Sequence, residues 1–279
     1  MSAHADAIAR ASARAWERMV GAVPGAWTSH RGGAVGVVTG IALQGMNGVW
    51  GVDSAPDTGT IATLLDSVAA HRLPFCMQLR PGWHPDVADV ARAHRMQRVA
   101  GEPVMVLDDG RSLAAAQAAQ AAPTLDLRQL GLEEGGTHAA LVAAAFGDCD
   151  DAPYGQLVTK DVLTTEGIRC YVGETAGRAV TTCCGVTVGE CVAIFSVATH
   201  PDARRRGYGA AVTARAVADG LAAGAQWAWL SSSEAGFGVY RALGFRVVER
   251  WDFWESTAQA TVSGAPHGPG PPTSPPDGA

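Results

Sequence analysis

The sequence lacks several features that mark whole classes of protein. Its six cysteines include no CxxC pair, and no His/Cys spacing suited to zinc occurs, so no metal site is expected. No uncharged apolar run is long enough to span a bilayer, and residues 1–20 lack the compact apolar core and cleavage site of a signal peptide. These absences predict a cytoplasmic protein whose cysteines are reduced, buried thiols.

Positive charge is also scarce. Asp and Glu outnumber Lys and Arg by 27 to 21, which gives a formal net charge of −6. Binding to nucleic acid or to a membrane surface needs positive charge spread over a face, so neither partner is expected. Local clusters of basic residues therefore say more about possible ligands than the net charge does. Hydrophobic residues make up 47% of the 279 residues, which is enough for a sizeable core.

Composition changes divide the chain into two halves. An Ala- and Gln-rich stretch predicts a linker at 111–122, between a front half at 1–110 and a back half at 123–260. Residues 261–279 are mostly Pro, Gly and Ser and cannot bury apolar surface, so a disordered tail is expected there.

Hydrophobic runs and turn residues predict the order of elements in each half. In the back half we expect strands at 168–173, 179–188, 191–198, 226–230 and 246–254, and helices at 157–166, 208–222 and 236–243. In the front half we expect strands at 47–52, 74–79 and 102–107, and helices at 58–70 and 85–94. A gapless overlay also places "VARAHRMQRV", from Val90, over "VYRALGFRVV", from Val239. The pattern predicts an α/β fold of two tandem units, each a mixed central sheet flanked by helices, with chance similarity as the alternative.

The segment "HPDARRRGYG", from His200, lies between a predicted apolar strand and a predicted helix. The first N–H groups of a helix have no partner inside it, so a helix start attracts anions. Two glycines let the backbone approach a bulky phosphate. Three arginines add enough positive charge to hold a second phosphate group. A pyrophosphate fits this pattern best, because neither GxxxxGK[ST] nor a suitably placed GxGxxG is present. The residues are Arg204, Arg205, Arg206, Gly207 and Gly209. A surface turn with solvated arginines is the alternative.

Two pieces of the back half resemble one protein family. "FSVATHPDARRRGYGAAVTARAV", from Phe195, resembles the signature segment of the GNAT superfamily of N-acyltransferases, which use acetyl-CoA. "YRALGF", from Tyr240, resembles the family's C-terminal YxxLGF element at the expected distance. The resemblance covers about Leu157 to Trp254. The front half looks like the degenerate companion domain of two-domain bacterial members.

The resemblance implies a binding mode for acetyl-CoA as cosubstrate. In this family the strand before the loop splays from its neighbour, and its backbone pairs with the pantetheine arm. Main-chain groups of the loop hold the pyrophosphate. Ser233 stands where many members have an asparagine, and its hydroxyl can still hydrogen-bond the cofactor. The strand residues would be Val197, Ala198 and Thr199, and the loop residues Arg205, Arg206, Gly207, Tyr208, Gly209 and Ala210.

The resemblance also implies a reaction, in which an amine attacks the thioester directly without a covalent acyl-enzyme. Tyr240 matches the tyrosine that often serves in this family as the acid for the leaving thiolate. A tyrosine suits this role because its pKa is near that of a thiol. The alternative is that Tyr240 only packs in the core. Glu190, acting through a water, and Glu234 are candidate bases, although either is more often a solvated carboxylate. The competing function is a non-catalytic acyl-CoA-binding or regulatory protein. The acceptor amine is not specified by the sequence, and a homodimer is left open.

The front half has a corresponding strand–loop–helix segment, but it lacks both the basic loop and the tyrosine. "DSAPDTGT", from Asp53, has two aspartates and no arginine, and Ala91 falls under Tyr240 in the overlay. A pyrophosphate would be repelled there, so we expect no cofactor in the front half. It is expected to shape the acceptor pocket or to serve as a scaffold.

Overall fold

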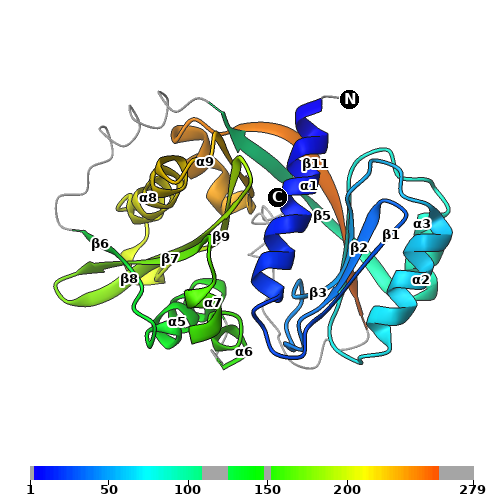
Figure 1. Ribbon diagram of the computed structural model, residues 1–279, viewed down its shortest axis with the longest axis horizontal. Coiled ribbons are helices and arrows are strands. Elements are labelled where there is room, and N and C mark those ends of the chain that lie inside the picture. Colours follow the sequence, from blue (N-terminus) through cyan, green and yellow to red (C-terminus); the bar gives the residue numbers. More distant parts are fainter. Residues whose placement is uncertain (1–2, 109–124, 148–151, 258–279) are drawn as a thin grey trace, which may run out of the picture.

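A computed structural model describes residues 3–108, 125–147 and 152–257 of the chain (Figure 1). The linker predicted at 111–122 and the tail predicted at 261–279 lie outside these ranges. The described strands form one eleven-stranded mixed sheet, in the order β1-β2-β3-β4-β11-β5-β10-β9-β8-β7-β6. The predicted fold class, α/β with a mixed sheet flanked by helices, is confirmed. The strands of both halves join in a single sheet.

The elements follow one another along the chain with these bounds. The strands are β1 (Trp27–Arg31), β2 (Ala34–Val38), β3 (Asn47–Gly51), β4 (Cys76–Leu79), β5 (Met96–Leu107), β6 (Asp126–Gln129), β7 (Ile168–Thr175), β8 (Arg178–Val188), β9 (Cys191–Thr199), β10 (Trp227–Ser231) and β11 (Arg246–Ser256). The helices are α1 (Ala3–Val20), α2 (Thr58–Ala69), α3 (Val87–Ala93), α5 (Gly135–Phe146), α6 (Ala152–Gly155), α7 (Lys160–Thr164), α8 (Tyr208–Ala222) and α9 (Glu234–Ala242), with a 3₁₀ turn at Pro201–Ala203.

Helix α8 packs on one face of the back-half strands. Its apolar residues recur at helical spacing, and Val212, Ala216 and Val217 are buried with Leu230 of β10 in one cluster. A Cβ at Gly220 would lie 2.6 Å from the Cβ of Val192, so glycine is what lets α8 approach β9 this closely. The sequence pattern therefore sets both the helix and its distance from the sheet.

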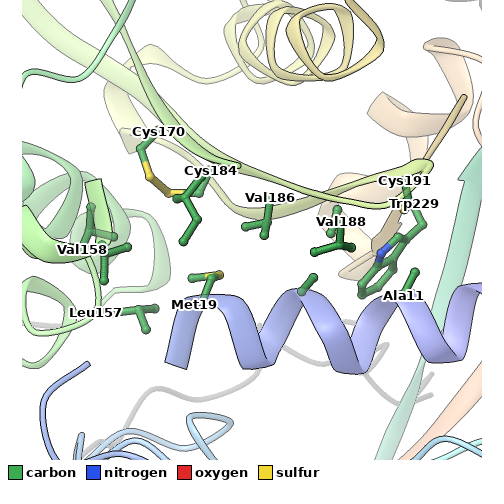
Figure 2. Packing of buried hydrophobic residues seen from close by; sticks show 14 of the residues in the cluster. Ala11, Met19, Leu157, Val158, Cys170, Cys184, Val186, Val188, Cys191 and Trp229 are labelled. Atoms are coloured by element: carbon green, nitrogen blue, oxygen red, sulfur yellow. A yellow bond between two sulfur atoms is a disulfide. The ribbon is translucent and has the colours of Figure 1, made fainter. Parts of the chain in front are cut away.

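Helix α1 covers the opposite face, together with α5 and α7 (Figure 1). Figure 2 shows Ala11 and Met19 of α1 packed beneath Val186, Val188 and neighbouring residues of the back-half strands. Other residues of α1, including Ala13 and Val20, pack on β2 and β3 of the front half. A single amphipathic helix thus contributes to the cores of both halves.

The two halves exchange their long strands. Strand β5 of the front half lies between β11 and β10, and β11 of the back half lies between β4 and β5. The guanidinium of Arg80, the residue after β4, is 1% exposed and donates to both carboxylate oxygens of Glu249 on β11 and to the carbonyl of Val52. Each half is completed by a strand of the other. The division of the chain into 1–110 and 123–260 stays a prediction, and this pairing crosses it.

Most elements expected from the sequence are present, and several were missed. The helix expected at 208–222 has the bounds of α8, and the strand expected at 191–198 is β9 with one residue more. The strand expected at 102–107 begins six residues earlier, at Met96. The helix expected at 157–166 is only five residues long. The elements that the sequence analysis missed are α1, β1, β2, β6, α5 and α6.

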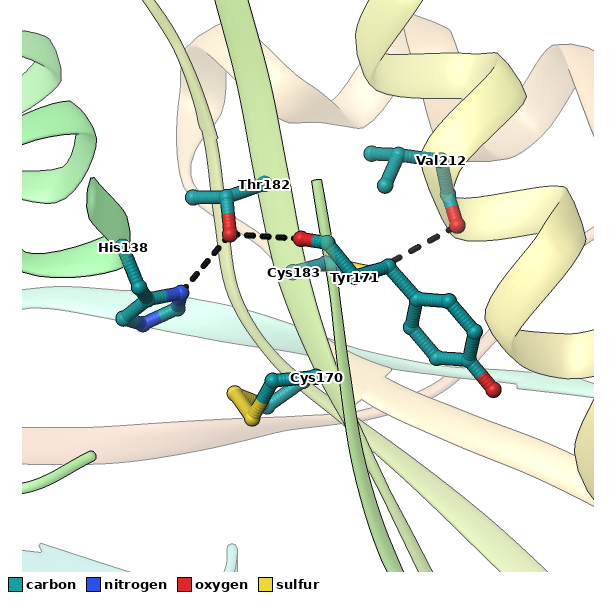
Figure 3. Close-up of a disulfide and its surroundings, with 7 residues drawn as sticks. His138, Cys170, Tyr171, Thr182, Cys183 and Val212 are labelled. Atoms are coloured by element: carbon teal, nitrogen blue, oxygen red, sulfur yellow. Dashed lines mark hydrogen bonds between the residues drawn. A yellow bond between two sulfur atoms is a disulfide. The ribbon is translucent and has the colours of Figure 1, made fainter. Parts of the chain in front are cut away.

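The expectation that all the cysteines are reduced is wrong for one pair. Cys170 on β7 and Cys184 on β8 form a disulfide, which Figure 3 shows in its surroundings. The two residues face each other in the antiparallel register, with their Cα atoms 4.1 Å apart, and only this register brings the two thiols together. Cys149 lies outside the described residues. The free, buried thiols are those of Cys76, Cys183 and Cys191.

Candidate functional site

Strands β9 and β10 run side by side only at their beginning. Their parallel pairing joins Cys191–Ala193 to Trp227–Trp229 and is not continued beyond these residues. Ser196 has a positive φ of 50°, and the register with β8 shifts between Thr182 and Cys184, which marks a bulge. The rest of β9 therefore diverges from β10. Val197, Ala198 and Thr199, the residues predicted to contact pantetheine, all lie beyond the last pair.

The loop after β9 presents unpaired backbone donors. It contains the 3₁₀ turn, capped by His200, and two left-handed residues, Arg205 (φ 62°) and Gly207 (φ 81°), before α8 begins at Tyr208. The backbone N–H groups from Arg205 to Ala210 donate to no acceptor among the residues that the structure describes. Such donors, aimed from alternating backbone conformations at a helix start, form an anion-binding concavity.

The three arginines of the loop have different surroundings. The Arg204 guanidinium donates to the carbonyl of Ala145 at 2.6 Å, near the C-terminal end of α5, and to the carbonyl of Thr199. Its side chain therefore ties the loop to α5. Arg205 and Arg206 are exposed, and neither side chain has a hydrogen bond or ion pair within the described part of the chain. These two remain the side chains able to meet an anion at the loop.

Tyr240 lies on α9 beside the sheet. It is 8% exposed, and its ring packs edge-on against Phe245, 6.0 Å away between ring centres. Burial, followed by the charges of Cys183 and Glu102, raises the pKa of its hydroxyl, so Tyr240 keeps its proton at neutral pH. The hydroxyl makes no hydrogen bond to another described residue. Its proton is available to a bound molecule.

Ser233 starts α9 and is exposed. Its Oγ accepts from the backbone N–H of Gly236 at 3.2 Å, as an N-cap does, and the hydroxyl proton remains free to donate. Glu234 follows in the first turn of the same helix and is also exposed.

Glu190 is not brought together with these residues. It lies in the turn before β9, where its carboxylate accepts from the side chain of Gln226 at 2.7 Å. Thr199 is nine residues further along the extended strand, which at about 3.3 Å per residue places the two roughly 30 Å apart. Glu190 thus lies at the start of β9, before the point where β9 and β10 separate, and its role as a base stays a prediction.

Glu102 is a carboxylate that the sequence analysis passed over. It lies on β5, and its Oε2 accepts a 2.6 Å hydrogen bond from the hydroxyl of Ser231, the last residue of β10. Burial is the main cause that raises the pKa of Glu102, and the charge of Glu255 adds to it, while the Ser231 hydrogen bond opposes. In the sequence, Glu102 is recognisable only as the first residue of the apolar strand expected at 102–107. Its position beside Ser231 depends on a strand pairing between the halves.

Glu102 and Tyr240 belong to opposite faces of the sheet. Val104 and Trp229 pack on the face that α1 covers, and Ser231 and Glu102 follow them at the two-residue spacing of a strand. Tyr240 packs on the other face, with Met105 and Leu230. Both groups stand where β9 and β10 have separated, and the Glu102 charge reaches Tyr240.

The front half has a different corner at the corresponding place. Asp57 caps α2, and its carboxylate accepts from the N–H of Thr60 at 2.7 Å. The start of this helix thus already holds a negative group.

Within the described residues no helix has the length and apolar character needed to cross a membrane. No three metal-ligating side chains gather in this part of the chain either.

Comparison with known proteins agrees with this geometry. Residues 166–247 match the family described as an acetyltransferase (GNAT) domain. The amino-acid sequence matches no curated protein.

Solved structures with the same fold span most of the chain. A GCN5-related N-acetyltransferase from Kribbella flavida is 18% identical with a TM-score of 0.65, covering 92% of this chain and 97% of that one. A GCN5-related N-acetyltransferase from Sphaerobacter thermophilus is 18% identical with a TM-score of 0.54, and 80% of each chain is covered. A tandem GNAT protein from the clavulanic acid biosynthesis pathway is 14% identical with a TM-score of 0.53, covering 84% and 83%. At such identities the likeness establishes the fold, and one of the three is a tandem protein.

Proposed function

We propose that this protein, which carries a GNAT acetyltransferase domain at residues 166–247, transfers an acetyl group from acetyl-CoA to an amine. One observation carries the proposal. A strand that separates from its neighbour leads into a loop of unpaired N–H groups at the start of α8. A thioester carrier with a diphosphate needs both parts, an extended backbone edge and an anion site.

Binding of acetyl-CoA would use the two parts in sequence. The backbone of Val197, Ala198 and Thr199 would pair with the pantetheine amides in the gap between β9 and β10. The N–H groups from Arg205 to Ala210 would hold the pyrophosphate, with the side chains of Arg205 and Arg206 adding charge. Arg204 would position the loop through its hydrogen bond to the carbonyl of Ala145, and Ser233 would donate its free hydroxyl proton.

The chemistry would be direct attack without an acyl-enzyme. The amine nitrogen forms a bond to the thioester carbonyl carbon, and the C–S bond breaks. Tyr240 would give its proton to the departing thiolate, because its hydroxyl makes no hydrogen bond to another described residue and so is free to donate. The reaction also releases one proton from the attacking nitrogen, and this proton needs an acceptor.

Glu102 would accept that proton. It stands on the face of the sheet opposite Tyr240, so an amine arriving from the α1 side would meet the carbonyl between the base and the acid. The Ser231 hydroxyl fixes one carboxylate oxygen and leaves the other free. A raised pKa suits a base that must take a proton from an ammonium group near neutral pH. In this mechanism the front half supplies a catalytic residue.

Release of free thiol from acetyl-CoA across a panel of amine acceptors tests the proposal. Tyr240→Phe and Glu102→Gln should each lower kcat by about a hundredfold or more, with little change in acetyl-CoA affinity. Glu190→Gln makes the same change at the remote end of β9, and it should leave kcat unaltered. Glu102 would be excluded as the base if Glu102→Gln and Glu190→Gln had equal kcat. Acetyl-CoA binding without thiol release for any acceptor would instead favour the non-catalytic regulatory function.

A further inference from the structure

A basic cavity lies in the front half, away from the loop of Arg205 and Arg206. It has a volume of about 360 Å³ and opens between α1 and the hairpin of β1 and β2. Arg10 and Arg14 line it from α1, Arg31 from the end of β1, and Gly32 and Gly33 from the hairpin turn. Its volume is in the range of pockets that hold small organic molecules.

The three arginines of the cavity have no protein partner. None of Arg10, Arg14 and Arg31 makes a side-chain hydrogen bond or ion pair to a residue within the described ranges. Arg128, by contrast, is held in place by two glutamates. Three planar guanidinium groups around one hollow, with their donors unused, suit ligands with phosphate or carboxylate oxygens.

The acidic groups nearby leave the cavity positive. Glu17, the one carboxylate in the lining, is bonded to the ring of His30. Asp53 lies against Gly33 at the edge. Two carboxylates set against three guanidinium groups leave a surplus of positive charge, in a protein whose total is −6.

The walls of the cavity are fixed by packing. Arg10 and Arg14 are one helical turn apart, so both side chains leave α1 on the same side. Gly32 and Gly33 have positive φ angles of 49° and 79°, and the Gly33 carbonyl accepts from the N–H groups of Val52 and Asp53. The hairpin turn is therefore bound to the end of β3, and the distance between the helix and the turn is set before any ligand arrives.

We propose that this cavity binds a small molecule carrying at least two anionic groups, either phosphates or carboxylates. The site belongs to the front half and is separate from the acetyl-CoA loop. The proposal does not depend on the transferase reaction.

Calorimetric titration with two probes tests the site and tells the two chemistries apart. Inorganic pyrophosphate represents phosphates and citrate represents carboxylates. Both are titrated into Gly207→Glu protein, whose loop site is blocked, so that binding at the loop is not counted. At least one probe should bind, and Arg10→Gln, Arg14→Gln or Arg31→Gln, added to that background, should weaken binding by about ten- to a hundredfold.

Arg92→Gln is the matched control, because Arg92 is exposed on α3 and away from the cavity. Binding should be unchanged in this variant. The proposal is overturned if neither probe binds to the Gly207→Glu protein, or if the cavity variants bind as tightly as the Arg92→Gln control. A probe that binds the wild type only at the loop would show no binding to the Gly207→Glu protein. Binding at the loop therefore cannot be mistaken for binding in the cavity.

Discussion

The buried ring of His138 makes the stability of the fold depend on pH. His138 lies on α5, 2% exposed, and its Nδ1 is 2.7 Å from the hydroxyl of Thr182, which donates in turn to the carbonyl of Tyr171 (Figure 3). Since the hydroxyl proton is used, Nδ1 must be the donor to the hydroxyl oxygen. Burial lowers the pKa of His138 to about 4 from an ordinary value of 6.5.

The magnitude follows from these two pKa values. Between pH 6.5 and pH 4 the unfolded chain binds a proton at His138 and the folded chain does not, so stability falls as the pH is lowered. The contribution is fully present above pH 6.5. About 2 kcal/mol of it is lost between pH 8 and pH 5, and about 3 kcal/mol once both states are protonated.

Urea unfolding at pH 8 and pH 5 measures this loss. His138→Gln keeps an N–H donor for Thr182 but does not titrate, so its stability should fall less than that of the wild type by about 2 kcal/mol. His84→Gln removes an exposed histidine and should behave as the wild type does. If the wild type and His138→Gln lost the same stability between the two pH values, the neutral buried ring would be refuted.

Three further perturbations test the architecture. Arg80→Ala should destabilise the fold by about 3–5 kcal/mol, because it leaves the largely buried carboxylate of Glu249 without its cationic partner, with only the Trp251 indole still donating to it; urea unfolding measures this, and a loss below 1 kcal/mol would contradict it. Cys170→Ser should cost about 3 kcal/mol, as expected for a crosslink between residues 14 apart, and the buried Cys184 thiol should be alkylated once the variant is unfolded without a reductant. A fragment of residues 1–110 should not fold alone, because it lacks the strand that lies between β4 and β5; a cooperative unfolding transition in circular dichroism would contradict the exchange of strands.

The parts of the site that were predicted from the sequence are those specified locally. The strand, the glycine loop and the helix are consecutive, and each has its own signal: an apolar run, residues suited to positive φ, and helical periodicity. Gly207 has a positive φ of 81°, and α8 begins at the expected Tyr208. Local sequence was sufficient for the order and bounds of these elements because the residues that signal each of them are consecutive, whereas the bond from Arg204 to Ala145 joins residues 59 positions apart.

The parts that were missed depend on pairings between distant residues. Glu102 meets Ser231 across 129 positions, and the disulfide needs the register of β7 on β8. Hydrophobic patterns indicate that a strand is buried without naming its neighbour, so the exchange of β5 and β11 had no signal in the sequence.

Calorimetric titration with acetyl-CoA tests the central claim most directly. The wild type should bind one acetyl-CoA, and Gly207→Glu should abolish binding, because a side chain and a negative charge enter the anion site at a residue with φ of 81°. Gly224→Glu places the same side chain at another left-handed glycine with open space around it, in the turn after α8, and should bind normally. A wild type without affinity for acetyl-CoA, or equal affinity in the two glycine variants, would contradict the assignment of this loop as the acetyl-CoA site.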